Sequence, residues 1–372
     1  MTQEDPVKFV APEVERWVYP AETKENLDWA ELTTIDISTF DQPGGKEKLA
    51  QELASAIQHD GFWAVVGHGI PKTEVERQFA LGKAFFGKQT LEQKATRTVK
   101  FEDGDYFGYK PRHVKKMFGT EVRENAELIN IPKFTESGHF EDIHKELPFV
   151  QYFRDEIEPF SKKTYEVARK LFVLFALILE LPENYFADKH KYDDYSDDHL
   201  RYMQYEPRSA EDDAKVENNW ARAHTDFGSL TLLFSQVVAG LQIKTGDGEN
   251  SQWKYVKPVD DGIVCNIGDG LSFWSNSFFR STIHRVVRPP EDQVTAPRLG
   301  LFYFVRPGDG AQIEVAPSPL LKRLGLYKEL KPITGTLYVR SRVKNYHDST
   351  SYDKRAGEKF RVGDFEIADG FE

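Results

Sequence analysis

Cysteine is nearly absent from this chain, in which Cys265 is the only one among 372 residues. A single thiol excludes an intramolecular disulfide and a metal site made of several cysteines. The lack of disulfides fits a reducing compartment, so we expect a cytoplasmic protein. The acidic first residues contain neither the basic nor the apolar segment of a secretory signal, which agrees with that expectation.

Basic residues and long apolar runs are scarce as well. The chain has 49 Lys and Arg against 60 Asp and Glu, a formal net charge of −11. General nucleic-acid binding needs a basic surface, so we expect no nucleic-acid partner. The longest apolar run, 171–179, is far shorter than the roughly 20 residues that cross a bilayer, and we expect a buried helix there and no membrane partner. The oligomeric state stays open.

Aromatic residues, by contrast, are abundant. The chain contains 27 Phe and 16 Tyr, and 40% of its residues are hydrophobic. This supply suits a β-rich core or an apolar binding pocket.

The patterns along the chain predict helices first and strands afterwards. After an extended arm over about 1–30, helical spacing and end signals predict helices near 45–60, 72–86 and 149–181, with strands at 34–37 and 62–66. From residue 200 onward, apolar runs between turn signals predict strands at 200–205, 230–234, 241–244, 262–267, 284–287 and 300–305. Such an order favours a β-sandwich or barrel with helices packed on one side. After Tyr338 we expect a charged tail that ends in a helix or without structure.

His224, Asp226 and His284 are the most informative residues of the chain. Two imidazoles and one carboxylate are the ligand set of a non-haem Fe(II) centre with open coordination positions. Residues i and i+2 of a strand point to the same face, so His224 and Asp226 would reach one metal, with His284 supplied by a neighbouring strand. A His-X-Asp triplet also occurs by chance, and the turn and apolar strand after Asp226 strengthen this interpretation.

Arg298 begins the strand that follows His284. A guanidinium group binds carboxylates through two parallel hydrogen bonds. Near an iron with open positions, such a group suits the far end of a dicarboxylate co-substrate. An ion pair with a surface carboxylate is the alternative role.

Several strings between Ile35 and Val305 occur in a characteristic order: 61–70 (GFWAVVGHGI), 85–94, 181–186 (LPENYF), 224–233 (HTDFGSLTLL), 266–269 (NIGD), 274–276 (WSN) and 281–287 (STIHRVV). In these strings the chain resembles the Fe(II)/2-oxoglutarate-dependent dioxygenases of the isopenicillin N synthase-like superfamily. The resemblance implies an α+β fold with a mainly β core, a double-stranded β-helix (jelly-roll or cupin-like) with flanking helices. We expect one catalytic unit over 1–372, with a helix-rich region at 1–190, the β-helix and its iron at 195–310, and a helical, charged extension at 311–372.

Carried over by position, the resemblance implies that His224, Asp226 and His284 are the catalytic iron ligands. Arg298 would hold the distal carboxylate of 2-oxoglutarate, and Tyr205 of the string 201–205 would also contact that co-substrate. The implied cofactors are Fe(II), 2-oxoglutarate and O2, with ascorbate as a candidate reductant. The implied reaction hydroxylates or otherwise oxidises a small organic molecule while 2-oxoglutarate is decarboxylated to succinate, and natural-product biosynthesis is one setting for it. The carboxylate of Asp226 argues against a halogenase.

The chain departs from the family pattern at the outer end of the co-substrate. Gly300 stands where the family usually has a serine, and Met203 stands where it has the asparagine of its N-X-Y motif. Because of these departures, a 2-oxoglutarate-independent Fe(II) oxidase of the same fold stays open as an alternative. A non-catalytic binding protein is the second alternative.

Candidate substrate-binding residues come from an aromatic, glycine-containing stretch and from the strands around the metal site. Their alternative role is core packing or, for the charged ones, a surface ion pair. The candidates are Tyr106, Lys110, Arg112, Arg222, Phe227 and Phe304.

Overall fold

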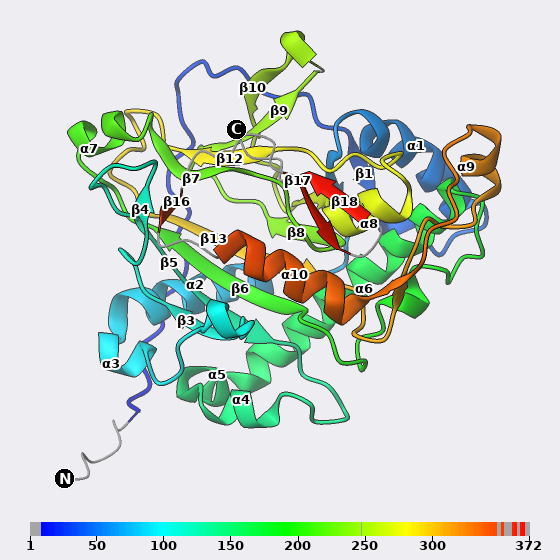
Figure 1. Cartoon of the computed structure of the whole chain (residues 1–372). Helices are drawn as coiled ribbons and strands as arrows, with labels where there is room; N and C mark the ends of the chain where they lie inside the picture. Colours follow the sequence, from blue (N-terminus) through cyan, green and yellow to red (C-terminus); the bar gives the residue numbers. More distant parts are fainter. Residues whose placement is uncertain (1–8, 247, 348–350, 353–358, 363–364, 369–372) are drawn as a thin grey trace.

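The computed structural model describes residues 9–246, 248–347, 351–352, 359–362 and 365–368. Two β-sheets face each other and form the centre of the molecule (Figure 1). Strands β1 and β2 run parallel, and the other neighbours within the two sheets run antiparallel. The large sheet has the order β1 (Thr34–Asp36), β2 (Phe62–Val66), β11 (Ile263–Ile267), β8 (Leu230–Phe234), β13 (Arg298–Val305), β6 (His199–Tyr205), β5 (Ala126–Pro132) and β3 (Gly108–Lys110), and the small sheet has the order β10 (Gln252–Tyr255), β9 (Leu241–Thr245), β12 (His284–Val287) and β7 (Asn219–His224).

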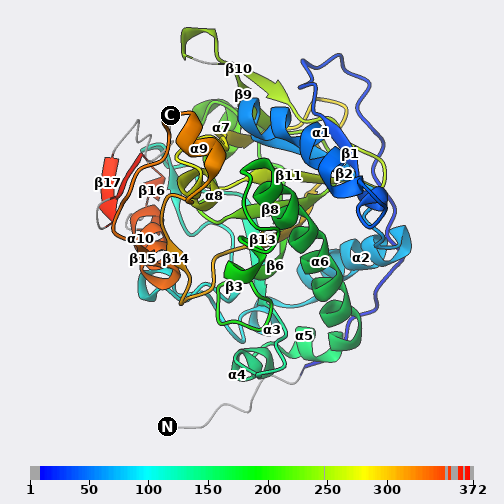
Figure 2. The same cartoon turned by 90° about the vertical axis from the view of Figure 1, so that its right-hand side faces the viewer.

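Three long helices cover the outer face of the large sheet (Figures 1 and 2). They are α1 (Gly45–His59), α2 (Lys72–Lys88) and α6 (Arg154–Ile178), and they pack on β2, β6 and β13. In α1 the buried Leu49, Leu53 and Ile57 recur at helical spacing, so one face of the helix is apolar and meets the sheet. No helix among the described residues is long and apolar enough to cross a bilayer.

The remaining elements are short and lie at the edges of this core. The short helices are α3 (Leu91–Lys94), α4 (Glu141–Lys145), α5 (Pro148–Tyr152), α7 (Ala210–Lys215), α8 (Asp269–Trp274) and α9 (Pro319–Arg323), with 3-10 turns η1 (Ile37–Thr39), η2 (Phe101–Asp103), η3 (Ala187–Lys189) and η4 (Gly248–Asn250). The chain then continues into the longer α10 (Gly335–His347), which packs against η2 and crosses the front of the molecule in Figure 1. The short strands are β4 (Lys116–Met117), β14 (Gln312–Ile313), β15 (Ile333–Thr334), β16 (Ser351–Tyr352), β17 (Lys359–Val362) and β18 (Phe365–Ala368).

Strand β13 shows how the two-residue period of a strand separates core from pocket. Leu299, Leu301, Tyr303 and Val305 belong to the apolar core under the helices. The alternate side chains, starting with Arg298, point between the two sheets and line a pocket. The space between the sheets is therefore where polar and charged side chains are brought together.

The expected fold class is confirmed, and the strands predicted after residue 200 occur within a few residues of their predicted bounds. Three expectations need correction. The helix expected over 149–181 is interrupted at Phe153, which separates α5 from α6. Strand β5 lies in a stretch to which no element was assigned, because its buried Glu127 and Asn130 hide the apolar pattern. The tail after Tyr338 contains short strands besides its helix, and the rest of it lies outside the described residues.

Candidate metal and co-substrate site

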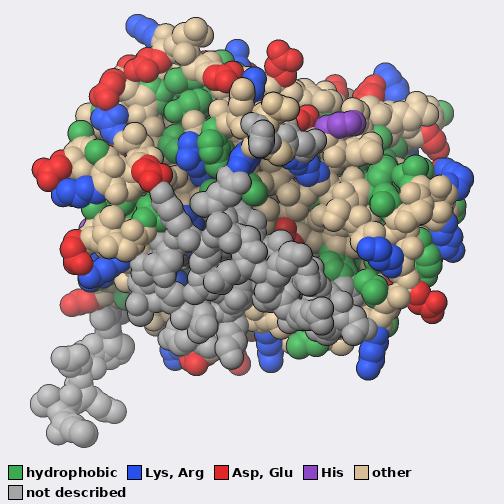
Figure 3. Space-filling model, turned by 45° about the horizontal axis from the view of Figure 1, so that its top comes forward, with side chains coloured by type: hydrophobic (Ala, Val, Ile, Leu, Met, Phe, Trp, Pro, Cys, Tyr) green, Lys and Arg blue, Asp and Glu red, His purple; other side chains and the backbone are tan. Residues whose placement is uncertain are grey.

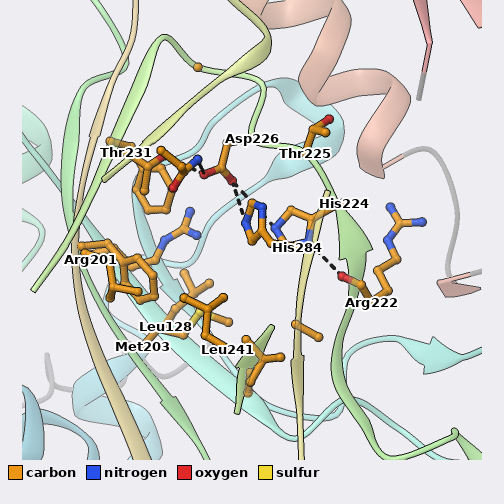
Figure 4. A pocket seen from close by; sticks show the side chains of 18 of the residues that line it. Leu128, Arg201, Met203, Arg222, His224, Thr225, Asp226, Thr231, Leu241 and His284 are labelled. Carbon is orange, nitrogen blue, oxygen red and sulfur yellow. Dashed lines mark hydrogen bonds and ion pairs between the residues drawn. The ribbon is translucent and has the colours of Figure 1, made fainter. Parts of the chain in front are cut away.

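His224, Asp226 and His284 converge between the two sheets (Figure 4). One ligand atom from each lies within 4.8 Å of the others. Oδ1 of Asp226 is 3.8 Å from Nε2 of His224 and 3.7 Å from Nε2 of His284. The two imidazole rings are 4.4 Å apart between centroids. Three donor atoms thus face one point, as a metal ion requires.

The outer atoms of these side chains are held by neighbours, which sets the direction of the inner ones. Nδ1 of His224 lies 2.8 Å from the carbonyl of Arg222, and Nδ1 of His284 lies 3.1 Å from that of Thr282. Because a carbonyl only accepts, each Nδ1 carries the proton and each Nε2 presents its lone pair to the site. Figure 4 shows both rings turned toward Asp226.

Asp226 is fixed through its second oxygen. Oδ2 accepts hydrogen bonds from Thr231 Oγ1 at 2.6 Å and from Asn266 Nδ2 at 2.9 Å. Burial raises the pKa of this carboxyl, but the two histidines and these two donors outweigh it and hold the pKa below its usual value. Burial, reinforced by the charge of His284, lowers the pKa of His224 to about 4. At neutral pH the set is therefore a carboxylate with a neutral imidazole at His224, the protonation states that a metal ion needs.

The two ligands of the His-X-Asp triplet do not share one strand. Strand β7 ends at His224, and Asp226 lies in the following turn. The start of α8 holds this turn, since the backbone N–H of Asp269 donates to the carbonyl of Asp226 at 2.7 Å. A Cβ atom at Gly268 would lie 2.2 Å from the carbonyl oxygen of Gly228, so only glycine permits this approach. The expectation that Asp226 shares a strand with His224 is corrected, because a backbone turn directs its carboxylate toward the two imidazoles.

A chain of contacts joins this turn to α10. The carboxylate of Asp269 accepts hydrogen bonds from Ser281 Oγ at 2.6 Å and from Thr225 Oγ1 at 3.1 Å, and it pairs with the guanidinium group of Arg342. Thr225 stands between the two residues of the triplet, and Arg342 is 4% exposed. Burial raises the pKa of Asp269, and Arg342 opposes that effect. Arg342 of α10 is therefore connected, through Asp269, to the turn that carries Asp226.

Arg298 lies in the same pocket as a buried cation. It is 2% exposed, its Nη1 has no hydrogen-bond partner, and its Nε donates to the carbonyl of Val238 at 3.3 Å. Across β6 and β13 it pairs in register with Tyr205, whose ring lies 5.9 Å from the guanidinium carbon. Burial lowers the pKa of Arg298, and among the described residues no carboxylate is paired with it. Such a group fits an anion that the protein itself does not supply.

Phe302 explains the glycine at position 300. A Cβ atom at Gly300 would lie only 2.4 Å from Cε2 of Phe302. The ring thus occupies the space where a serine side chain would stand. This position contributes an apolar wall to the pocket instead of a hydroxyl.

Most of the predicted substrate-binding residues line this pocket, together with the triad, Arg298 and Tyr205. Arg112 does not line it and forms ion pairs with Glu127 and Glu206 at 3.5 and 3.6 Å. Lys110 lines it but is paired with Glu124 at 2.6 Å. The others that line the pocket are Tyr106, Arg222, Phe227 and Phe304.

Two arginines of the pocket had not been predicted, Arg201 of β6 and Arg306 just after β13. The period of two along both strands would have indicated them, since Arg201 shares its face with Tyr205 and Arg306 shares its face with Arg298. Asn266 and Thr231, which hold Asp226, were also missed as site residues.

A double-stranded β-helix that holds a His/Asp/His set beside a buried arginine defines the class of non-haem Fe(II) oxygenases that use 2-oxoglutarate. Two family profiles agree with this assignment. One, described as the 2OG-Fe(II) oxygenase superfamily, matches residues 196–307, and one, described as the non-haem dioxygenase in morphine synthesis N-terminal region, matches residues 32–146. The chain belongs to the 2OG-Fe(II) oxygenase superfamily and is an oxidoreductase that uses Fe(II) and 2-oxoglutarate.

Relatives cover nearly the whole chain. A UPF0676 protein of Schizosaccharomyces pombe is 29% identical over 84% of this chain and 92% of its own length. The 2-oxoglutarate-Fe(II) type oxidoreductase hxnY of Emericella nidulans is 26% identical over 90% and 96%. Among solved structures, a full-length Neurospora crassa protein in complex with alpha-KG is 25% identical, covers 86% of this chain and 99% of its own, and has a TM-score of 0.71. A rice dioxygenase for auxin oxidation shares the fold at 20% identity, covers 91% of this chain and 100% of its own, and has a TM-score of 0.67.

Proposed function

We propose that His224, Asp226 and His284 hold the Fe(II) of this oxygenase, and that Arg298 with Tyr205 binds the distal carboxylate of 2-oxoglutarate. The observation that carries the proposal is the pairing of a converging His/Asp/His set with a buried guanidinium group in one pocket. The substrate is a small organic molecule that enters the rest of this pocket. Molecules of this size are seen with similar proteins, such as the thymine in one structure of the Neurospora crassa protein.

The residues of the chain divide the work among binding, orientation and protection. When bound, Fe(II) supplies the chemistry by which O2 and 2-oxoglutarate yield an oxidised substrate, succinate and CO2. Arg298 anchors the co-substrate at the end away from the triad, and Asp226 offers one oxygen to the metal while Thr231 and Asn266 restrain the other. The surrounding aromatic side chains exclude water and keep the substrate in a fixed position.

The test is an anaerobic spectrum. Fe(II) and then 2-oxoglutarate are added without O2, and a weak visible charge-transfer band is expected when the 2-oxo acid chelates the metal. Bound iron without this band would contradict the use of 2-oxoglutarate at these residues and favour an oxidase of the same fold. A protein that binds no iron would favour a binding protein.

Two variants test whether iron binding and activity depend on His224. His224→Ala should lose both iron binding and succinate formation, because it removes one of three donor atoms. His59→Ala is the control, since His59 lies exposed at the end of α1. Retention of iron and activity in His224→Ala would refute the ligand assignment.

A further inference from the structure

The pocket has a second cationic end. Counting along β13, the eight residue steps from Arg298 to Arg306 correspond to about 26 Å at about 3.3 Å per residue. Arg298 is assigned to 2-oxoglutarate in the proposal above. Arg306 and its neighbour Arg201 remain unexplained by it, although both line the same pocket.

Arg306 is buried without the hydrogen bonds that a guanidinium group normally has. It is 3% exposed, and its Nε and Nη1 have no hydrogen-bond partner among the described residues. Its guanidinium carbon lies 4.3 Å from the ring of Tyr106 and 4.4 Å from that of Phe227. A carboxylate oxygen of Asp197 lies 3.6 Å from Nη1 of Arg306. The rings fix the plane of the group, and its N–H edge is left for a ligand.

Arg201 is held in place entirely by neutral groups. Its Nε donates to Asn130 Oδ1 at 2.7 Å, and its Nη2 lies 3.3 Å from Nε2 of His199. Nδ1 of His199 lies 2.8 Å from the carbonyl of Asp197, so Nδ1 carries the proton and Nε2 accepts from Arg201. Burial keeps the pKa of His199 well below its usual value, which agrees with a neutral ring. No carboxylate among the described residues neutralises Arg201, whose guanidinium group extends into the pocket on the side of Asp226 (Figure 4).

The two cations at this end differ in their counter-ions. Arg306 lies 3.6 Å from the carboxylate of Asp197, whereas Arg201 has no carboxylate partner among the described residues, and both line the pocket. Asp198 is already engaged, because it accepts the backbone N–H of Arg306 at 2.6 Å and lies 3.9 Å from Lys133 Nζ. Arg201 is half-buried, and a cation that is partly withdrawn from water without a counter-ion is costly, so a bound carboxylate would stabilise it.

Flat apolar surfaces border this cationic end. The rings of Phe302 and Phe304 stack at 5.6 Å, and Arg201 lies 4.5 Å over the ring of Phe304. Phe227 lies 6.0 Å from Tyr106, nearly at right angles to it. Aromatic walls beside a guanidinium group suit a planar ligand with one acidic end.

We infer that the substrate is a planar organic carboxylate. Its carboxylate binds the N–H edges of Arg306 and Arg201, and its ring lies among Phe227, Phe302 and Phe304, which directs the far part of the ring toward the triad. The inference rests on the proposed function, because it assigns the opposite end of the same pocket to 2-oxoglutarate. It gives the acid a position separate from Arg298, so substrate and co-substrate bind together without competing.

The test compares carboxylates with neutral molecules of the same shape. The Fe(II) protein is saturated with 2-oxoglutarate without O2, and the charge-transfer band is recorded first. Calorimetric titrations then use 4-methylbenzoate against 4-methylbenzamide, and indole-3-carboxylate against indole-3-carboxamide, with thymine as a neutral heterocycle. At least one carboxylate should bind about tenfold or more tightly than its amide, because a charged hydrogen-bonded pair replaces a neutral one.

Variants assign the preference to the two arginines. Arg306→Met and Arg201→Met should each reduce the preference for the carboxylate to a few-fold at most, and Arg306→Lys should retain part of it because the charge remains. Arg285→Met is the matched control. Arg285 donates through Nε to Gln242 Oε1 at 2.8 Å and lies 4.2 Å over Trp253, so it imitates the setting of Arg201 outside the pocket. The control should keep the full preference.

The outcomes separate the two proposals. If the charge-transfer band is present, three outcomes overturn the substrate class alone. They are equal binding of each carboxylate and its amide, tighter binding of thymine than of the carboxylates, and no carboxylate binding at millimolar concentration. A preference that survives in both Arg306→Met and Arg201→Met also overturns it. The absence of the band overturns the proposed function, and the substrate class with it.

Discussion

Replacement of Arg298 by methionine should strongly weaken co-substrate binding with little effect on the stability of the unliganded protein. The guanidinium group is 2% exposed and forms one hydrogen bond, at 3.3 Å, while its Nη1 has no partner. A buried unpaired donor costs about 1–3 kcal/mol, which is similar to what the hydrogen bond and the contact with Tyr205 contribute. Methionine fills much of the space of the arginine stem. The free energy of unfolding should therefore change by no more than about 1 kcal/mol.

The expected loss of affinity is much larger. Two hydrogen bonds between a guanidinium group and a carboxylate contribute about 1.5–3 kcal/mol each. Since about 1.4 kcal/mol corresponds to a factor of ten, the dissociation constant of 2-oxoglutarate should rise by about 100-fold or more. The same substitution thus separates a binding role from a structural one.

Arg208→Met provides the matched contrast. The side chain of Arg208 is 9% exposed and is paired with Asp213 at 3.0 Å, and the side chain of Asp213 is 0% exposed. Removing Arg208 leaves the carboxylate of Asp213 with the guanidinium group of Arg288 at 3.4 Å and the indole N–H of Trp220 at 3.0 Å, so the lost partner should cost about 1–3 kcal/mol. This variant should lower the free energy of unfolding and leave the affinity for 2-oxoglutarate unchanged.

The assay combines urea unfolding of the metal-free protein with an anaerobic titration of the charge-transfer band by 2-oxoglutarate. A fall in affinity of less than about tenfold in Arg298→Met would refute the assignment of this residue. A loss of about 3 kcal/mol in its unliganded state would refute the argument that the arginine is kept for a ligand and not for the fold.

The neighbourhood of the site supports three further predictions. Gly300→Ser should weaken 2-oxoglutarate binding in the same titration, since its Cβ would meet the Phe302 ring at 2.4 Å, and Phe302→Leu in the same chain should restore it. Arg342→Met should lower Fe(II) affinity about tenfold, measured by metal titration, while leaving 2-oxoglutarate affinity of the iron-loaded protein unchanged, because the arginine acts on the metal-bearing turn from outside. Burial lowers the pKa of His190 to about 3, so this histidine stays neutral in the folded state and binds a proton in the unfolded state below about pH 6.5. The free energy of unfolding should therefore fall as the pH falls below about 6.5. His190→Gln should reduce the slope of this free energy against pH by about 1.4 kcal/mol per pH unit between about pH 6 and 4. An unchanged slope in urea unfolding would contradict this expectation.

The sequence predicts those parts of the fold whose local pattern agrees with their surroundings. Strands β2, β8 and β12 have the predicted bounds; β2 and β8 are short, mainly apolar runs between turn signals, and β12 lies in the recognisable string 281–287. Strand β5 could not be predicted in this way. Its Glu127 is buried since Lys94 and Tyr109 bind it at 2.7 and 2.6 Å, and both partners are distant in the sequence or on another strand. A buried polar group becomes acceptable only through partners that a local pattern does not contain.

The charges on the surface indicate the function less clearly than the pocket does, both in the sequence and in the structure. Acidic and basic side chains of the described residues are interspersed over the face seen in Figure 3. On that face, therefore, neither sign of charge gathers into a patch that would mark a site. The candidate functional residues lie between the sheets, where some charged groups are paired and others, such as Arg298, have no carboxylate partner among the described residues.

The site residues that were predicted and those that were missed differ in the sequence pattern that indicates them. The triad occurs in recognisable strings and Arg298 begins a predicted strand, and the structure brings these residues into one pocket. Arg201 was part of the string 201–205 only as a neighbour of Tyr205, and Arg306 belongs to no string, yet the alternation of a strand places them on the same faces as Tyr205 and Arg298. What the alternation cannot show is whether an arginine on that face meets a carboxylate. Arg208 does, at 3.0 Å, and is explained by the fold, whereas Arg298 has none among the described residues and is explained by a ligand. Arg201 also has no carboxylate partner among the described residues, so we explain it by an acidic ligand. Arg306 would bind the same ligand, because the single carboxylate of Asp197 does not balance the charges of both arginines.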